Sequence, residues 1–200
     1  LSQRDAELIV YKYLWNMSEK EISEMFHIKQ EQVHVYVGRA KKRLFKIIKK
    51  EMEISLHAGE LVGVLYDALL KQYKDPGNPE TLKSLNKLCV RLVFCLYAED
   101  AGIFGSKSMF HDYLEHHRAE DRRALINLFQ VLDQDIPQRD KYMDDDLAAF
   151  PYVNGGLFAD EDIEIPRLGD EVIDLILRRA SEDFDWSDIS PTIFGAVFES

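Results

Sequence analysis

Hydrophobic residues recur every three or four positions along most of the chain, and this spacing predicts α-helices. In residues 1–50 the pattern predicts three helices: one over about 2–14, a short one over 19–26, and a long one from Gln30 to Lys50. The apolar row of the third helix is Val33, Val37, Ala40, Leu44 and Ile47. Its lysines and arginines fall largely off this row, so the helix is expected to be apolar on one face and basic on the rest.

Local signals set the limits of the short middle helix. Ser18 stands three positions before Glu21, which is the spacing of a capping box, in which each residue satisfies a free backbone N–H of the other. Residues 27–29 are expected to form a tight turn into the third helix. The side chains expected to be buried by the middle helix are Ile22, Met25 and Phe26.

The rest of the chain is also expected to be helical, apart from one loop-rich stretch. The expected helices span 55–74, 80–101, 108–117 with Ser108 as cap, 119–132 and 169–182, with a last one beginning at Ser190-Pro191. The breakers in residues 75–79 end the first of these. Residues 133–168 are expected to be loop-rich, with a short strand at 163–166. The fold class is therefore mainly α: an N-terminal three-helix helix-turn-helix followed by an irregular helical bundle with a loop-rich segment.

Charge divides the chain into two parts. Residues 1–50 hold 11 Lys and Arg against 6 Asp and Glu, a net charge of +5. Residues 51–200 hold 14 against 30, a net charge of −16. Such asymmetry suggests two modules with different partners. The basic part could contact phosphates, whereas the acidic part would be repelled by a duplex.

A short helix, a tight turn and a basic third helix are typical of a helix-turn-helix, whose third helix enters the major groove of double-stranded DNA. Residues at the start of that helix reach base edges, and basic residues further along meet phosphates. The base-edge candidates are Lys29, Gln30, Gln32, His34 and Tyr36, and the phosphate candidates are Arg39, Lys41, Lys42 and Arg43. The alternative is a basic amphipathic helix that packs on a neighbouring segment or on a partner protein.

The segment LSQRDAELIVYKYLWNMSEKEISEMFHIKQEQVHVYVGRAKKRL resembles region four of bacterial sigma factors. The Leu-Ser opening, the Ser-x-x-Glu-Ile box and the Arg-Ala-Lys-Lys-Arg-Leu tail carry the resemblance. Two departures are Tyr36, where the family often has Arg, and Gly38 within the helix. The resemblance implies the fold, but base specificity does not transfer.

Three later blocks, SLNKLCVRLVFCLYAEDAGIFG (84–105), FPYVNGGLF (150–158) and DISPTIFGAVFES (188–200), resemble the helical spacer of MmeI-like restriction–modification enzymes and related adenine-specific DNA methyltransferases. The resemblance implies a parent with a downstream methyltransferase core that uses S-adenosylmethionine. This core would be a partner within the same parent chain. The expected domains are a helix-turn-helix over 1–50, a helical spacer over 55–185, and the start of a truncated methyltransferase domain over 186–200. That family usually has a nuclease where this chain has the sigma-like segment.

Several smaller constellations have a functional and a simpler interpretation. The Asn-Gly-Gly of 154–156 could meet a phosphate, but a turn with positive φ at the glycines is favoured. Glu99-Asp100 is interpreted as part of a structural ion pair with an arginine. A zinc site is disfavoured for His111, Glu115, His116 and His117. For Asp144, Asp145 and Asp146 a solvated loop is favoured over a cation site. Cys89 and Cys95 are expected to be reduced and buried.

The favoured function is that of a fragment of a bacterial DNA methyltransferase that supplies a spacer and a DNA-binding unit, with no catalytic, cofactor or metal residue of its own. One alternative is a sigma-like transcription regulator that contacts RNA polymerase and carries an acidic protein-binding module. Another is a purely structural scaffold with a mis-joined N-terminus. The sequence has no apolar run of membrane-spanning length and no signal-peptide pattern, so a cytoplasmic protein without a membrane partner is expected.

Overall fold

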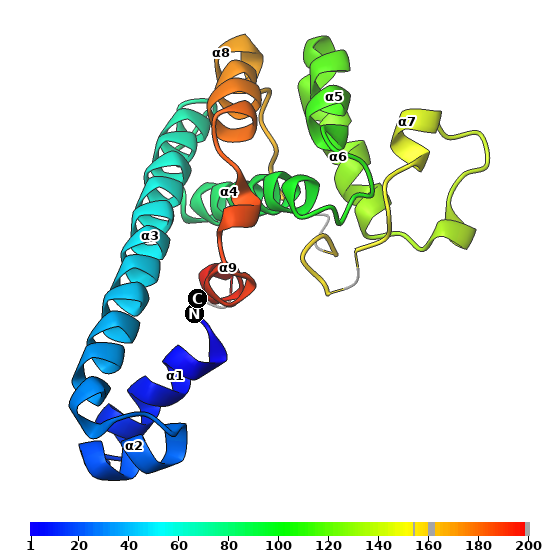
Figure 1. The fold of residues 1–200 in the computed structure, drawn as a ribbon. Coiled ribbons are helices and arrows are strands. Elements are labelled where there is room, and N and C mark those ends of the chain that lie inside the picture. The colour runs from blue at the N-terminus through cyan, green and yellow to red at the C-terminus, as the bar shows by residue number, and fades with distance from the viewer. Residues whose placement is uncertain (154, 160–162, 199–200) are drawn as a thin grey trace. The chain divides into compact units, whose positions relative to one another are not determined.

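The computed structural model describes residues 1–153, 155–159 and 163–198, and over these ranges the chain consists of helices and loops without a β-strand (Figure 1). The chain divides into two compact units, unit 1 over Leu1–Leu56 and unit 2 over His57–Ser200. The predicted fold class is confirmed, while the predicted domain limits stay predictions. No helix in the described ranges is long and apolar enough to cross a membrane.

Unit 1 is built from local capping interactions. Its elements are α1 (Gln3–Ile9), the π-helical turn η1 (Val10–Leu14), α2 (Glu19–Phe26) and the first part of α3 (Gln30–Leu70). The predicted capping box is present, because the Ser18 N–H donates to Glu21 Oε2 over 2.8 Å and the Glu21 N–H donates to Ser18 Oγ over 3.3 Å. His27 ends α2 in the left-handed conformation, with a φ of 51°, and so forms the predicted turn.

The core of unit 1 joins all three helices. Its fully buried members are Leu8, Ile22, Val33 and Val37, with Tyr11, Met17, Phe26, Ile28 and Tyr36 packed against them. The predicted burial of Met25 is wrong, since its side chain is 49% exposed. The buried face of α2 lies on the side of Ile22, Ser23 and Phe26, and Met25 projects away from that side.

Helix α3 is longer than predicted. The sequence suggested one helix ending near Lys50 and another beginning near residue 55, but the structure has one continuous helix over Gln30–Leu70. Residues 50–55 contain neither glycine nor proline, and an exposed ion pair joins Lys49 Nζ to Glu53 Oε1 over 3.7 Å. The change of charge sign near residue 50 therefore does not interrupt the backbone. The helix does end before the breakers in 75–79, as predicted.

In unit 2 the apolar helix α4 (Pro79–Asp100) runs through the middle of the bundle (Figure 1). Leu85, Leu88, Leu92 and Leu96 are all fully buried along it. The helix α5 contacts α4, α6 and the π-helix η4. The elements after α4 are α5 (Met109–His116), η2 (Arg118–Glu120), α6 (Asp121–Leu132), η3 (Ile136–Gln138), α7 (Asp145–Ala148), α8 (Gly169–Asp174), η4 (Leu175–Glu182), η5 (Trp186–Asp188) and α9 (Pro191–Phe198).

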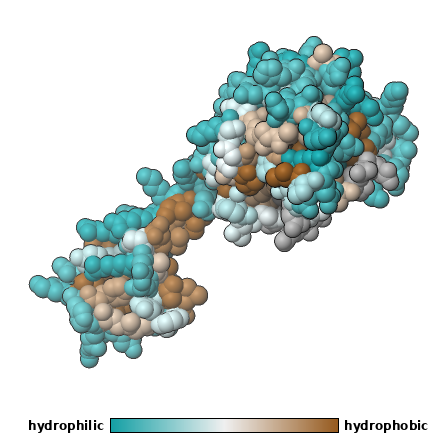
Figure 2. Space-filling view, turned by 90° about the vertical axis from the view of Figure 1, so that its right-hand side faces the viewer, coloured by the Kyte–Doolittle hydropathy of each residue, from teal (hydrophilic) through white to brown (hydrophobic). Residues whose placement is uncertain are grey.

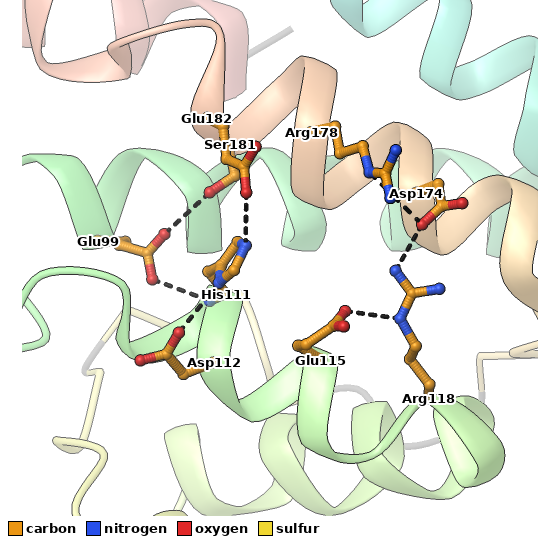
Figure 3. Close-up of polar contacts among 9 residues, drawn as sticks. All are labelled: Glu99, His111, Asp112, Glu115, Arg118, Asp174, Arg178, Ser181 and Glu182. Carbon is orange, nitrogen blue, oxygen red and sulfur yellow. Dashed lines mark hydrogen bonds and ion pairs between the residues drawn. The ribbon is translucent and has the colours of Figure 1, made fainter.

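A buried carboxylate from α4 caps the N-terminus of α5. Ser108 was predicted to be that cap, but it has a left-handed backbone with a φ of 61° and its side chain makes no capping bond. Instead, Glu99 Oε2 accepts hydrogen bonds from the backbone N–H groups of Phe110 and His111 over 2.6 and 2.9 Å. Glu99 Oε1 accepts one from Ser181 Oγ over 3.3 Å, and Figure 3 shows Glu99 between His111 and Ser181. Burial raises the pKa of Glu99, and the two backbone hydrogen bonds partly counter this effect.

Two more carboxylates act in the same way. Asp121 accepts the N–H groups of Leu168 and Gly169, over 3.3 and 2.9 Å, at the start of α8. Asp100 accepts the Trp186 N–H over 2.7 Å at the start of η5. The ion pair predicted for Glu99-Asp100 with an arginine is therefore wrong for the described part of the chain, where backbone amides and a serine take that place. Each of these acids ties together elements that are far apart in the sequence.

The loop-rich stretch is held by side chains that bind backbone carbonyls. Arg139 donates to the carbonyl oxygens of Gln134, Val131, Ala148 and Phe150. This one guanidinium therefore joins the end of α6 and the turn after it to the end of α7 and the residues that follow α7.

The strand predicted over 163–166 is not formed. The chain there has no regular secondary structure, and its backbone carbonyls pair with side chains of other segments: the Glu164 carbonyl accepts a hydrogen bond from Tyr73 Oη over 2.8 Å, and the Ile165 carbonyl accepts one from Arg122 Nε over 2.7 Å. An alternating apolar pattern next to a proline is compatible with such a segment as well as with a strand, and no second strand is present in the described ranges to pair with it.

Replacing Glu99 by Ala is expected to lower the free energy of unfolding of unit 2 by about 2–4 kcal/mol, because two backbone N–H groups at the start of α5 lose their acceptor. Urea denaturation followed by circular dichroism would measure the change. Glu115→Ala is the matched control, since it removes an exposed ion pair with Arg118 worth at most about 1 kcal/mol. Equal destabilisation by the two substitutions would show that Glu99 has no special structural role.

Candidate nucleic-acid interface

The base-edge candidates lie at the start of α3, where a helix-turn-helix would meet DNA. The side chains of Lys29, Gln30, Gln32 and His34 are exposed. Tyr36 is different, because it packs half-buried against the core of unit 1 with the guanidinium of Arg4 5.4 Å from its ring centre. Four of the five base-edge candidates are therefore free of the core, and Tyr36 has a structural role.

The phosphate candidates fall on different sides of α3. Successive residues turn by about 100° around a helix, so Gln32, Arg39 and Lys42 share one face, which is turned away from the buried Val33 and Val37. Both basic side chains on this face are exposed. The structure thus brings one polar base-edge candidate and two cations onto a single outward face, which we call the outward basic face (Gln32, Arg39 and Lys42).

Arg43 is engaged in the fold of unit 1. Its Nη1 donates to both carboxylate oxygens of Asp5, over 3.0 and 2.8 Å, and joins α1 to α3. The hydrogen bonds from Arg43 and then from Ser2 lower the pKa of Asp5. The sequence analysis missed this pair, because 38 residues separate the partners and no local pattern links them.

Lys41 lies beside aromatic rings. Its Nζ is 5.5 Å from the ring centre of Tyr13 and 5.6 Å from that of Phe45, which are cation–π distances. The rings of Tyr13 and Phe45 are more than half exposed. Lys41 is thus part of a mixed aromatic and basic surface rather than of the outward basic face.

In unit 2 the residues considered for zinc, His111, Glu115, His116 and His117, are bound to other side chains or to the backbone. His111 Nδ1 lies 3.0 Å from Asp112 Oδ1 and His111 Nε2 lies 3.3 Å from Glu182 Oε1, while Glu115 and Asp174 both bind Arg118 (Figure 3). His116 contacts the Asp112 carbonyl and His117 contacts Asp146. Within the described ranges no group of three or more potential metal ligands is suitably placed to hold an ion.

His111 connects α5 to η4 through Glu182. Burial lowers the pKa of His111, but the hydrogen bonds to Asp112 and Glu182 and the charges of Asp112 and Glu99 outweigh this effect and raise the pKa above its ordinary value of 6.5. The protonated ring is therefore stabilised by the folded chain. Below pH 6.5 this interaction contributes its full stabilisation, and the contribution is lost as the pH rises through the raised pKa.

The remaining small motifs have structural positions. Gly155 and Gly156 have positive φ values of 142° and 78°, as the predicted turn requires, while Asn154 lies outside the described residues. Asp145 and Asp146 begin the short helix α7, and Asp144 precedes it. Cys89 and Cys95 are free and buried, as predicted, and burial raises the pKa of Cys89 to about 11.

His111→Gln is expected to destabilise unit 2 by about 0.5–1 kcal/mol at pH values below 6.5 and by less as the pH rises further, because the charged ring no longer binds the partly exposed Glu182. Thermal unfolding over a series of pH values would measure this difference. Glu182→Gln should reduce the same pH-dependent component. A loss of stability that is equal at all pH values in either variant would contradict the assignment.

Comparison with known proteins identifies two segments. Residues 1–44 match the family described as "Sigma-70, region 4", and residues 83–158 match the family described as "MmeI, helicase spacer domain". The first match covers α1, α2 and the start of α3, and the second begins within α4 and continues past α7 to Phe158.

Two longer proteins are similar to the larger part of the chain. A protein of Bacillus subtilis (strain 168) named "DNA methyltransferase A" is 31% identical over 160 residues, and the match covers 76% of this chain and 17% of that protein. A solved structure, the Type IIL restriction–modification enzyme MmeI in complex with DNA, is 37% identical with a TM-score of 0.57, over 71% of this chain and 18% of that one. The chain thus spans less than a fifth of either relative. Within its 200 residues it combines a segment of the sigma-70 region 4 type with a helical spacer segment of the MmeI type.

Proposed function

We propose that the chain is part of a bacterial DNA methyltransferase of the restriction–modification kind, in which unit 1 binds double-stranded DNA and unit 2 is a helical spacer. The observation that carries the proposal is the 37% identity and TM-score of 0.57 to MmeI, a restriction–modification enzyme solved in complex with DNA. The similarity to a protein named DNA methyltransferase A supports the same parent activity.

The work of unit 2 in this proposal is mechanical. A spacer must keep a reactive core at a fixed distance from the DNA-binding elements, which requires helices that do not slide or unravel. The capping of α5 by Glu99 and of α8 by Asp121 supplies such fixed joints, because each acid joins the start of one helix to another helix with two hydrogen bonds. In this proposal the residues of the chain hold and orient the reactive core, and the rest of the parent protein carries out the chemistry.

The DNA-binding part of the proposal depends on the outward basic face. Arg39 and Lys42 are exposed cations on one side of α3, in the segment that matches sigma-70 region 4. Exposed cations at this point of a helix-turn-helix contact phosphates, which gives affinity, while Gln32 and the residues before it would reach base edges. The acidic unit 2 is expected to avoid the phosphate backbone.

The methyl donor of the parent is proposed to be S-adenosylmethionine, with adenine as the methylated base. The described residues do not fit this cofactor, because they contain no strand followed by a glycine-rich loop and a helix that could hold it. Both the cofactor and the flipped base would belong to a core further along the parent chain, acting in the cytoplasm.

A second candidate is a transcription regulator that contacts RNA polymerase through the sigma-like segment, with unit 2 as a protein-binding module. The match of residues 1–44 to sigma-70 region 4 favours it. The two candidates differ in what the purified chain binds without help. A methyltransferase part should bind duplex DNA alone, whereas a regulator that works through polymerase should bind the enzyme more tightly than it binds DNA.

The 200-residue chain is expected to bind duplex DNA at low salt, with a logarithm of the association constant that falls by about 0.9 per phosphate contact for each tenfold rise in salt concentration. Fluorescence anisotropy with a labelled duplex over a salt series would measure this slope. The absence of binding at low salt would contradict the role proposed for the outward basic face.

The double substitution Arg39→Ala with Lys42→Ala is expected to weaken binding and to reduce the salt slope by about 2, since two phosphate contacts are lost. Stability should be nearly unchanged, because both side chains are exposed. Lys71→Ala with Lys74→Ala in unit 2 removes the same charge and is expected to leave binding as it was.

Arg43→Ala is expected to behave differently, because it also leaves the buried carboxylate of Asp5 without its cation and so destabilises unit 1. Thermal unfolding of all three variants, measured beside the binding curves, separates the two effects. Equal binding by the Arg39/Lys42 variant and the unsubstituted 200-residue chain would rule out this face as the DNA contact.

A further inference from the structure

An exposed apolar row runs along α3 within unit 1. Its members are Phe45, Ile48, Met52 and Leu56, with exposed fractions of 57, 41, 59 and 66%. Their spacings of three, four and four residues place them on one side of the helix. We call this row the α3 stripe, and Figure 2 shows apolar side chains gathered along an exposed length of the helix.

The α3 stripe does not belong to the core of unit 1. That core takes Val33 and Val37 from the same helix, and neither residue is in the stripe. The Tyr13 ring and the Lys41 ammonium group adjoin the stripe at Phe45 and widen it at that end. Single exposed apolar residues are ordinary, but four in a row on one helix face indicate a surface that is covered in the assembled protein.

The charges of α3 indicate what covers the stripe. Residues 39–50 hold seven Lys and Arg and no Asp or Glu, whereas residues 51–70 hold four Asp and Glu and no Lys or Arg. A row beside the stripe repeats this order, with Lys46 and Lys49 followed by Glu53. Two parallel copies of the helix would set like charges side by side. Two antiparallel copies would set the basic stretch of each against the acidic stretch of the other.

We propose that the α3 stripe binds a second copy of this chain, with the two α3 helices packed antiparallel. The apolar row supplies the buried contact and the reversed charge order fixes the direction. This inference does not depend on the proposed methyltransferase parent.

Sedimentation velocity over a range of protein concentrations tests the association. The 200-residue chain is expected to form a dimer, and Ile48→Glu with Met52→Glu is expected to weaken it by about 100-fold or more, since each substitution acts in both copies. Ile47→Glu is the matched control, because it places the same charge on an exposed apolar position on another side of the helix. Circular dichroism checks that each variant keeps its helices.

Cross-linking tests the direction of the helices. Antiparallel packing brings position 48 of one copy near position 56 of the other, so a mixture of Ile48→Cys and Leu56→Cys chains should form a mixed disulfide under mild oxidation. Parallel packing would cross-link each variant with itself. The native thiols, Cys89 and Cys95, are buried, and the unsubstituted 200-residue chain measures any cross-linking through them.

Three results would overturn the proposal. One is an unsubstituted 200-residue chain that stays monomeric at every concentration, and another is a dimer that survives the two glutamate substitutions. The third is self-cross-linking of the Ile48→Cys chain in the absence of its partner variant, which would contradict the antiparallel direction.

Discussion

The architecture of unit 2 depends on carboxylates of one helix that cap the start of another. Glu99, at the end of α4, accepts two N–H groups at the start of α5, and Asp121, at the start of α6, accepts two at the start of α8. The first N–H groups of a helix have no partner within it, so their burial is unfavourable unless another group accepts them. These acids meet that need and at the same time fix the positions of α5 and α8. In the loop-rich stretch the roles are exchanged, because the Arg139 side chain donates hydrogen bonds to backbone carbonyl oxygens.

Unit 1 is organised by shorter-range rules. Ser2 caps α1 and Ser18 caps α2, and a small apolar core joins these helices to α3. The exception is the pair between Asp5 and Arg43, which ties the first helix to the third. Arg43 is held by Asp5, whereas Arg39 and Lys42 stay exposed for a partner. This difference allows the stability and the binding of unit 1 to be altered independently.

The sequence predicted the elements that are defined locally. The capping box at Ser18, the turn at His27 and the limits of α4 all follow from residues a few positions apart, and the structure confirms them. The errors concern long-range partners. Serine is a common helix cap, but Glu99, nine positions before Ser108 in the chain, caps α5. In the strand expected over 163–166, backbone carbonyls accept hydrogen bonds from Tyr73 and Arg122 instead of from a second strand. Among the site candidates, periodicity alone could separate exposed from buried positions of α3, but it could not show that Arg43 is bound to Asp5.

We propose that the described residues hold and orient the other parts of the parent protein, which carry the reactive groups. This proposal can be tested by the transfer of a labelled methyl group from S-adenosylmethionine to duplex DNA, with the 200-residue chain and the full parent protein assayed side by side. We expect the parent protein to label the DNA, and the 200-residue chain to bind the duplex without labelling it. Methylation by the 200-residue chain without any other protein would contradict it.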